Sequence, residues 1–519
     1  MKKNYLLFSL LLMAFTSCFE DEGNYDYKEV SDITINGIQK SYLVYSYVGE
    51  KLEIPATVQS GYTDLEYAWY IWDPSKSAST SGEKEKKEMT LIGTDKDLSY
   101  EVNLPPMNYK VMLEVKSKST GYASTVVTDV EISTTFLRGF YILKETADGN
   151  SELDFYHQDG EPLLENVLAS TGQEAMSGKP LSLGICYAQG YINAATNEVS
   201  KCNTVAVTTK NKEIAFFSTE DMTKLHDNSN VVYGGLEPGE TPYWAFTTPW
   251  TNCFLSSRGA TVSYPSDVMA SSGTFGTQSG TGGSVYATPA DDGGSGGTTM
   301  YWNQEDQCID YVFGMWMGHD GRGDYKNGAF PTEGMECLMM GASVSTDPSY
   351  CYLLLKDRDG KKYLYESSIS KMETVDRIEL DPSSKLANAT CYTTNMWTAS
   401  YLYYIYENQL YAYNLPERKE GDRPLALQGF DSSEQITYLS YKWVNCFKDA
   451  AAGLNFTYLV VGTQKGNSYK IYMYNIAGGE PRELVRTIEG EGKLHSVKYV
   501  TPQFYTNFNP DSSMDNTSI

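Results

Sequence analysis

The sequence predicts an all-β protein in which a β-sandwich is followed by a seven-bladed β-propeller. Between residues 31 and 133, short runs alternate apolar and polar residues, a pattern typical of half-buried strands. From residue 134 onward, one hairpin motif recurs at roughly 45–60-residue intervals, and repeats of about this length in an all-β chain are typical of propellers. The 42 tyrosines among 519 residues agree with this class, because tyrosine is enriched in strands.

The first element is an export signal over residues 1–17. Two lysines precede an apolar run, Tyr5–Phe15, and small polar residues lead to Cys18; the run is too short to span a bilayer permanently. This pattern resembles the lipobox of bacterial lipoproteins, so Cys18 is predicted to be the lipidated first residue of the mature chain. A plain secretory signal with an incidental cysteine is the alternative. Residues 18–30 are acidic and predict a tether.

Residues 31–133 predict an immunoglobulin-like sandwich, since six or seven short strands fit this length. Trp69, within the segment YAWYIW, is placed like the core tryptophan of such sandwiches. The polar segment Ser75–Glu88 predicts a surface loop. The expected strands are Ile33–Ile35, Lys51–Val58, Leu65–Trp72, Leu98–Leu104, Tyr109–Lys116 and Thr125–Ile132.

Residues 134–510 predict the propeller. The motif is an apolar or aromatic residue, any residue and an aromatic, on the second strand of a hairpin. It occurs at Leu153–Phe155, Ile214–Phe216, Val262–Tyr264, Ile309–Tyr311, Tyr363–Tyr365, Tyr411–Tyr413 and Tyr472–Tyr474. Seven copies indicate seven blades, and the late run Ser496–Val500 is expected to close the ring by pairing with the first blade. A series of β-sandwiches is the alternative. The Gly/Ser-rich segment 270–299 predicts a flexible loop that either contacts ligand or is a tolerated insertion.

Composition limits the function. The formal net charge of −25 opposes binding to nucleic acid or to anionic lipid, because both require a basic surface. Apart from Cys18, eight widely spaced cysteines form no metal-ribbon pattern and predict mostly buried thiols with one or two disulfides. The four histidines are scattered, so no metal site, cofactor or catalytic residue is predicted. A glycosidase would need only two well-placed carboxylates, and the sequence singles out no pair.

Four aromatic residues are the candidates for ligand contact: Tyr243, Trp244, Trp250 and Trp316. The first three lie in PYWAFTTPW, Pro242–Trp250. Its prolines oppose a central strand, so the rings are expected on a loop as an exposed aromatic platform. Trp316 precedes a polar, Gly-rich segment, Gly318–Gly328, which is interpreted as a surface loop.

The N-terminal part resembles the PKD-like-domain lipoproteins of Bacteroidetes. The resemblance is carried by GNYDYKE, Gly23–Glu29, and by SDITINGI, Ser31–Ile38, and is clearest over roughly residues 18–135. It implies an outer-membrane, cell-surface location and association with a TonB-dependent transporter and its substrate-binding lipoprotein. It supplies no catalytic residue.

The leading hypothesis is therefore a non-enzymatic surface lipoprotein that captures a polysaccharide or a polypeptide on the axial face of its propeller. Two alternatives remain open at this point. One is a propeller-based hydrolase, most plausibly a glycosidase. The other is a structural accessory subunit of a transporter complex.

Overall fold

The protein is represented by a computed structural model that describes most of the chain after the tether. The described residues are 32–45, 51–74, 89–104, 107–158, 160, 162–248, 251–263, 271–276, 281–288, 298–315, 319–323, 330–343, 350–368, 371, 373–395, 400–444 and 456–501. Within them nearly all the regular secondary structure is strand, with one short helix, α2 (Val167–Ser170), and one 3₁₀ turn, η2 (Leu386–Asn388). No helix of this part is long and apolar enough to cross a bilayer.

The N-terminal region is a β-sandwich, as the alternating pattern predicts. A five-stranded sheet has the order β2-β9-β8-β5-β6, and two further sheets pair β1 with β4 and β3 with β7. Trp69 in β5 is fully buried, and its indole N–H donates to the carbonyl of Asp95 at 3.0 Å. The strands are β1 (Ile33–Asn36), β2 (Ser41–Tyr45), β3 (Lys51–Ile54), β4 (Thr57–Ser60), β5 (Leu65–Trp72), β6 (Thr90–Gly93), β7 (Leu98–Glu101), β8 (Met107–Ser117) and β9 (Ala123–Ser133).

The sandwich differs from the prediction in three strands. The expected strand 51–58 is divided into β3 and β4, which belong to different sheets. A proline, Pro55, lies between them, and proline cannot donate a ladder hydrogen bond. The strands β2 and β6 were not expected. The segment Ser75–Glu88 lies outside the described residues.

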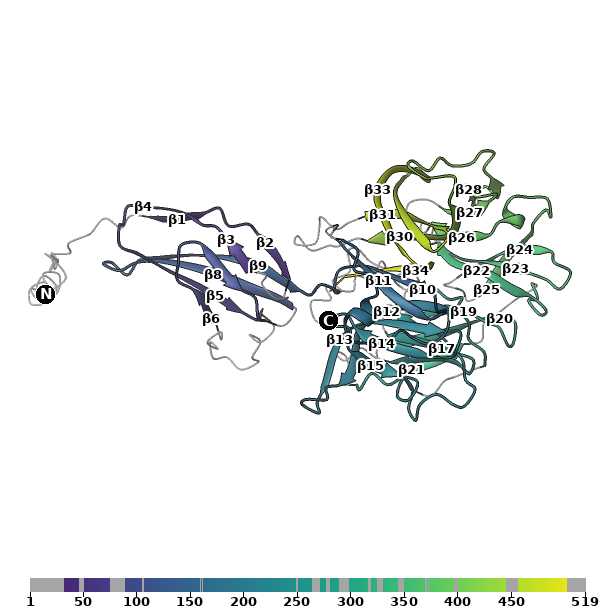
Figure 1. The fold of residues 1–519 in the computed structure, drawn as a ribbon, viewed down its shortest axis with the longest axis horizontal. Coiled ribbons are helices and arrows are strands. Elements are labelled where there is room, and N and C mark those ends of the chain that lie inside the picture. Colours follow the sequence, from purple (N-terminus) through teal and green to yellow (C-terminus); the bar gives the residue numbers. More distant parts are fainter. Residues whose placement is uncertain are drawn as a thin grey trace, which may run out of the picture. The chain divides into compact units, whose positions relative to one another are not determined.

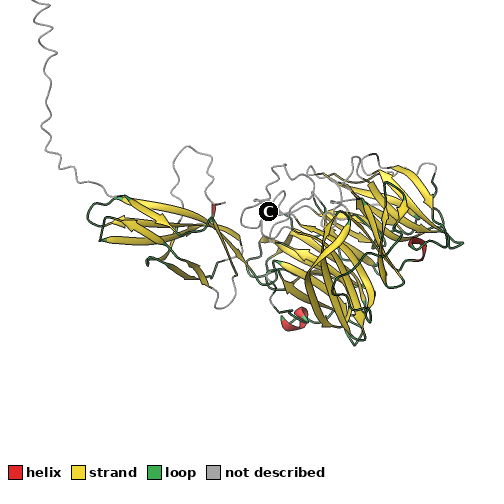
Figure 2. Cartoon of the chain, turned by 90° about the horizontal axis from the view of Figure 1, so that it is seen from above, coloured by secondary structure: helices red, strands yellow, loops and turns green. Residues whose placement is uncertain are grey.

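The rest of the chain forms a ring of seven small sheets, the blades of a propeller (Figures 1 and 2). The blades follow one another along the chain, except that the last strand joins the first blade. Blade 1 contains β34 (Lys493–Val500), β10 (Gly139–Glu145) and β11 (Ser151–His157); blade 2 contains β12 (Pro180–Ile192), β13 (Val199–Thr209), β14 (Ile214–Ser218) and β15 (Lys224–Asp227); blade 3 contains β16 (Pro242–Thr247), β17 (Asn252–Ser256) and β18 (Gly259–Ser263). Blade 4 contains β19 (Thr298–Asn303), β20 (Cys308–Met315) and β21 (His319–Gly323); blade 5 contains β22 (Glu336–Ser343), β23 (Tyr350–Lys356), β24 (Lys362–Ser368) and β25 (Glu373–Glu379); blade 6 contains β26 (Cys391–Asn395), β27 (Tyr401–Tyr406), β28 (Gln409–Asn414) and β29 (Lys419–Glu420); blade 7 contains β30 (Gln435–Val444), β31 (Phe456–Lys465), β32 (Ser468–Ala477) and β33 (Glu480–Glu491).

The ring closes where the sequence predicts. β34 pairs antiparallel with β10, from Gly139 opposite Val500 to Glu145 opposite Lys493. The first blade is therefore built from the two ends of the propeller sequence, which makes closure depend on residues more than 300 positions apart.

The repeated motif has one structural position. In all seven blades it lies on the second strand of a hairpin, namely β11, β14, β18, β20, β24, β28 or β32. Most of its side chains are buried; Tyr264 lies outside the described residues. Each blade thus contributes the same apolar strand to the packing against its neighbours, which explains the period of the repeat.

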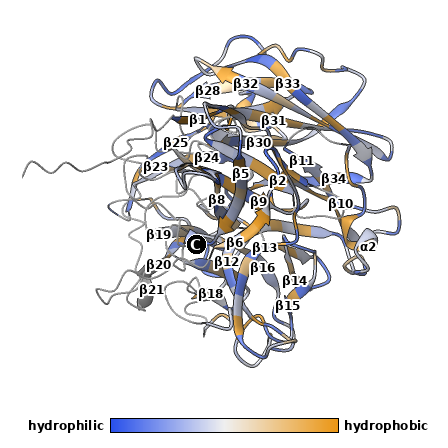
Figure 3. Ribbon diagram, turned by 90° about the vertical axis from the view of Figure 1, so that its left-hand side faces the viewer, coloured by the Kyte–Doolittle hydropathy of each residue, from blue (hydrophilic) through white to orange (hydrophobic). Residues whose placement is uncertain are grey.

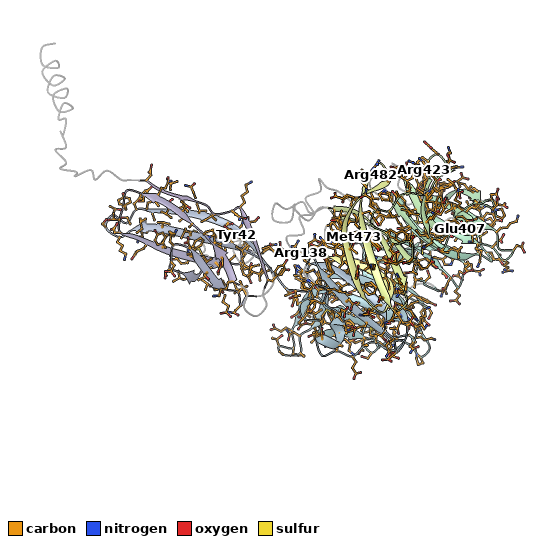
Figure 4. All side chains as sticks on the ribbon, turned by 45° about the horizontal axis from the view of Figure 1, so that its top comes forward. Tyr42, Arg138, Glu407, Arg423, Met473 and Arg482 are labelled. Carbon is orange, nitrogen blue, oxygen red and sulfur yellow. The ribbon has the colours of Figure 1, made fainter. Side chains whose placement is uncertain are left out.

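Seven hydrophobic clusters of described residues lie between the blades, one at each boundary, and each contains side chains from both neighbouring blades. At the first boundary, Leu153 of blade 1 and Val207 of blade 2 belong to one cluster. At the closing boundary, Phe140 of blade 1 and Met473 of blade 7 belong to another. Orange, hydrophobic stretches run along the strands in Figure 3, and side chains such as Met473 fill the space between the ribbons in Figure 4. The core is therefore distributed around the ring.

The described parts of the Gly/Ser-rich segment, residues 271–276 and 281–288, differ from the predicted flexible loop, whereas 277–280 and 289–297 lie outside the described residues. Ala287 bridges Tyr301, and Thr288 N–H donates to the Met300 carbonyl at 2.9 Å. These residues lie on the side of β19 opposite β20 and thus supply the inner edge of blade 4. Further back, Phe275 packs between blades 2 and 3. Glycine permits this approach, because a Cβ at Gly273 would lie 1.9 Å from a carbonyl oxygen.

A buried ion pair in blade 1 is hydrogen-bonded to blade 7, across the boundary where the ring closes. Lys144 Nζ of β10 lies 2.7 Å from Asp154 Oδ1 of β11, and both side chains are at most 2% exposed. The Tyr469 hydroxyl of β32 donates to Asp154 Oδ2 at 2.5 Å, and the Asn166 N–H donates to Asp154 Oδ1 at 2.7 Å. Blades 7 and 1 are therefore joined by a charge-assisted hydrogen bond as well as by apolar packing.

Candidate ligand-binding site

The N-terminal ends of the inner strands lie on one face of the propeller. On this face the turn between the second and third strands of a blade touches the segment that begins the next inner strand. In blade 3, the Gly283 N–H donates to the Ser256 carbonyl at 2.7 Å, and in blade 7, the Gly492 N–H donates to the Asn467 carbonyl at 2.6 Å. We refer to this side as the turn face.

Four inner strands begin with a β-bulge at the turn face. The pairing register shifts around the second or third residue of β12, β16, β22 and β30. The residues left out of the ladder are Leu181, Tyr243, Leu338 and Thr437. A bulge redirects a side chain away from the regular pleat, so these four positions form a repeated set at one end of the ring.

A cavity of about 380 Å³ opens where the inner strands of blades 5, 6 and 7 begin. Two of the bulge residues, Leu338 and Thr437, belong to its wall. Its size is within the range of about 300–1,000 Å³ that is usual for ligand pockets. The lining residues are Leu338, Lys362, Ala389, Thr390, Cys391, Tyr392, Thr437, Tyr438 and Leu439.

The two tyrosines of the wall are fixed by their hydroxyl groups. The Tyr392 hydroxyl donates to the Ala389 carbonyl at 2.7 Å. The Tyr438 hydroxyl donates to the Val497 carbonyl and accepts from the Val497 N–H, both at 3.2 Å. Both rings are thereby held in place, and burial raises the pKa of Tyr392 to about 12. The wall is pre-organised, which lowers the entropic cost of binding.

The charged group of the wall is the amine of Lys362, at the start of β24. Its Nζ donates to the Ala387 carbonyl at 2.5 Å. Partial burial lowers the pKa of Lys362, since desolvation disfavours the charged form. The thiol of Cys391 is half-buried, and burial raises its pKa, so it is a poor nucleophile at this site.

The lining contains neither a carboxylate nor an imidazole. The pair of carboxylates that a glycosidase requires is therefore not part of this cavity. Across the described residues, no group of three or more His, Cys, Asp or Glu side chains is placed to hold a metal ion.

The predicted aromatic platform is wrong for Trp244. Residues 242–247 form β16, the inner strand of blade 3, and Pro242 occupies its first position, where proline is tolerated. Trp244 is only 9% exposed, its indole N–H donates to the Leu183 carbonyl at 2.9 Å, and the Lys498 amine lies 5.1 Å from its ring centroid. Trp244 belongs to the cluster between blades 3 and 4.

Tyr243 lies on the turn face, at the blade 3 position that corresponds to Leu338 and Thr437. It is half-buried, and its hydroxyl is bonded to the side-chain amide of Gln304. Tyr243 therefore occupies the same bulge position as two of the cavity residues, but it does not line the cavity. Trp250, Trp316 and Cys18 lie outside the described residues.

The cysteines and histidines of the described residues form no further site. None of the seven cysteines within the described residues forms a disulfide, and five of them are buried, so the predicted disulfides are not found there. Cys446 lies outside this part. His226 is buried in blade 2, with Nε2 2.9 Å from the Gly190 carbonyl oxygen, and burial lowers its pKa. The segment 319–323, expected as a loop, is the strand β21.

Comparison with known proteins identifies the N-terminal part of the chain. Residues 18–180 match the PKD-like family. The protein therefore combines a PKD-like domain with a β-propeller. The match extends beyond the sandwich through β10 and β11.

Solved structures resemble the chain at low sequence identity. A quinonprotein alcohol dehydrogenase-like protein from Bacteroides thetaiotaomicron is 12% identical, with coverage of 91% of this chain and 100% of the other and a TM-score of 0.37. The periplasmic gluconolactonase of Pseudomonas aeruginosa is 10% identical, with coverage of 71% and 100% and a TM-score of 0.40. BamB from Moraxella catarrhalis is 12% identical, with coverage of 68% and 88% and a TM-score of 0.32. No curated protein sequence matches the chain.

Proposed function

We propose that this protein is a lipid-anchored protein of the outer-membrane surface whose propeller captures a glycan or a polypeptide without catalysis. The observation that supports this function best is the cavity at the turn face of blades 5–7. Its wall combines fixed aromatic rings, apolar side chains and a single amine, and it includes no carboxylate or imidazole. Such a lining suits binding, since general acid–base catalysis commonly uses a carboxylate or imidazole.

Ligand binding is tested with soluble protein that begins after Cys18, screened against panels of polysaccharides and peptides. Thr437→Trp places an indole on an exposed wall residue and is expected to abolish binding. Leu181→Trp is the matched control, because Leu181 is the bulge residue of blade 2 and lies outside the cavity. Binding that both variants lose equally, or turnover of any panel member, would contradict the proposal.

The anchor and the partners are tested in cells. Cys18→Ser is expected to release the protein from the membrane fraction, because a lipid on Cys18 is the proposed anchor; retention of the variant in membranes would refute it.

The proposed partners are a TonB-dependent transporter and its substrate-binding lipoprotein. Both should co-purify from native membranes, and recovery of a solitary lipoprotein would contradict an accessory role.

A further inference from the structure

Lys362 is a cation that lacks an anionic partner among the described residues. No ion pair there includes it, and its one hydrogen bond runs to the backbone carbonyl of Ala387. The carboxylate of Glu336 attracts Lys362 electrostatically but forms its ion pair with Lys356. An ammonium group carries three donors, so Lys362 retains two for a ligand. An amine that is partly desolvated and open to a cavity favours an anionic group there.

The surrounding wall supplies few acceptors for the hydroxyl groups of a neutral sugar. It contains no Asp, Glu, Asn, Gln or His side chain. The Thr390 hydroxyl is 3.4 Å from the Ile405 carbonyl, and the tyrosine hydroxyls are bonded to backbone groups. A sugar hydroxyl that is buried without an acceptor costs binding free energy. Leu338 and Leu439 instead offer apolar surface to a side chain.

The inner strands offer backbone groups to an extended chain. β22, β26 and β30 are each the terminal strand of their sheet, and within the described part of the chain no strand pairs with their other edge. Thr437 is exposed and stands outside the ladder between β30 and β31. An extended peptide can pair with a free strand edge while its side chains enter neighbouring pockets.

We propose that the cavity binds a short peptide segment whose free carboxylate pairs with Lys362. This inference rests on the proposed function and specifies its ligand. Lys362 is the only basic side chain in the lining of the cavity, so it is the group that would receive the carboxylate. The cavity of about 380 Å³ holds only a few residues, which makes a chain terminus the best fit.

The test uses acetyl-Leu-Ala-Phe with a free carboxylate and the same peptide as its C-terminal amide, titrated calorimetrically into the soluble protein. The acid is expected to bind about tenfold or more tightly than the amide, because a charge-assisted hydrogen bond is lost in the amide. Lys362→Gln is expected to remove this difference, and Lys362→Arg to retain it. Lys361→Gln is the matched control, since Lys361 is adjacent but pairs with Glu379 at 3.1 Å outside the cavity.

Several results would overturn the inference. Equal binding of acid and amide, or an equal loss of both in Lys362→Gln, would remove Lys362 as the carboxylate receptor. Tighter binding of a trigalacturonate than of the peptide acid would replace the peptide by an acidic sugar. If neither peptide binds but a neutral polysaccharide does, and Thr437→Trp blocks it, this inference fails while the proposed function stands. If nothing binds, both fail.

Discussion

Replacing Lys144 by methionine is predicted to destabilise the propeller strongly. Lys144 and Asp154 are 2% and 0% exposed, with 2.7 Å between Nζ and Oδ1. Methionine preserves much of the side-chain volume but leaves the Asp154 carboxylate buried without its cation. Removal of one partner of a buried ion pair costs about 3–5 kcal/mol. The hydrogen bonds from Tyr469 and Asn166 stabilise the remaining carboxylate, so the lower end of this range is expected.

Urea denaturation, followed by circular dichroism, measures the effect as a shift of the unfolding midpoint. Lys361→Met is the matched control, because the Lys361–Glu379 pair has a similar separation of 3.1 Å while both side chains are more than half exposed. An exposed pair contributes only about 0–1 kcal/mol. The double variant Lys144→Met/Asp154→Leu should regain part of the loss, since it buries no lone charge. The reasoning is refuted if Lys144→Met costs no more than Lys361→Met.

Three further predictions concern close packing, pH and thiol reactivity. Gly184→Ala should lower the melting temperature more than the control Gly421→Ala. A Cβ at residue 184 would lie 1.8 Å from the Ala245 carbonyl oxygen, whereas a Cβ at residue 421 would lie 3.1 Å from the Ala412 carbonyl oxygen. Equal melting temperatures of the two variants would contradict this. Burial lowers the pKa of His226, so the unfolded chain takes up the proton first and the free energy of unfolding should fall as pH drops below about 6.5. His226→Gln should show a smaller fall between about pH 7 and pH 5, and an unchanged fall would exclude His226 as a cause. Iodoacetamide should label Cys308 and Cys391 in the native protein before the five buried cysteines, as peptide mapping would show; early labelling of Cys253, whose pKa burial raises, would contradict the packing.

The repeat could be predicted because each copy is a local, period-two pattern, and the closing strand could be predicted because it is the last β-rich run of the chain, although its partner β10 lies more than 300 residues earlier. A motif such as Tyr472–Tyr474 marks a buried strand wherever it lies in a blade, and Ser496–Val500 is apolar enough to identify a final strand. The inner edge of blade 4 could not be predicted, because residues 284–288 lie in a Gly/Ser-rich segment whose composition indicates a loop. In the folded protein this segment pairs with β19. That pairing depends on the neighbouring strand, which the local composition does not indicate.

The cavity could not be predicted from the sequence, for a related reason. Its lining comes from three different blades, which lie far apart along the chain, and single residues such as Leu338 and Thr437 carry no local signal. Aromatic residues drew attention to blade 3 instead, where Trp244 proved to be part of the core. A proline marks only two of the bulges in the sequence, since Pro180 and Pro242 precede those in β12 and β16, whereas Cys337 and Ile436 precede the other two.

Different side chains occupy the repeated bulge positions of the turn face in blades 3, 5 and 7. In blade 3 the bulge position holds Tyr243, whose hydroxyl is bonded to Gln304, and the next residue packs beneath Lys498. In blades 5 and 7 the bulge positions hold the smaller Leu338 and Thr437, and blade 6 contributes Cys391 between them. Small side chains leave space that the larger ring of Tyr243 would fill. The seven blades thus supply one scaffold, and the side chains at equivalent positions differ from blade to blade.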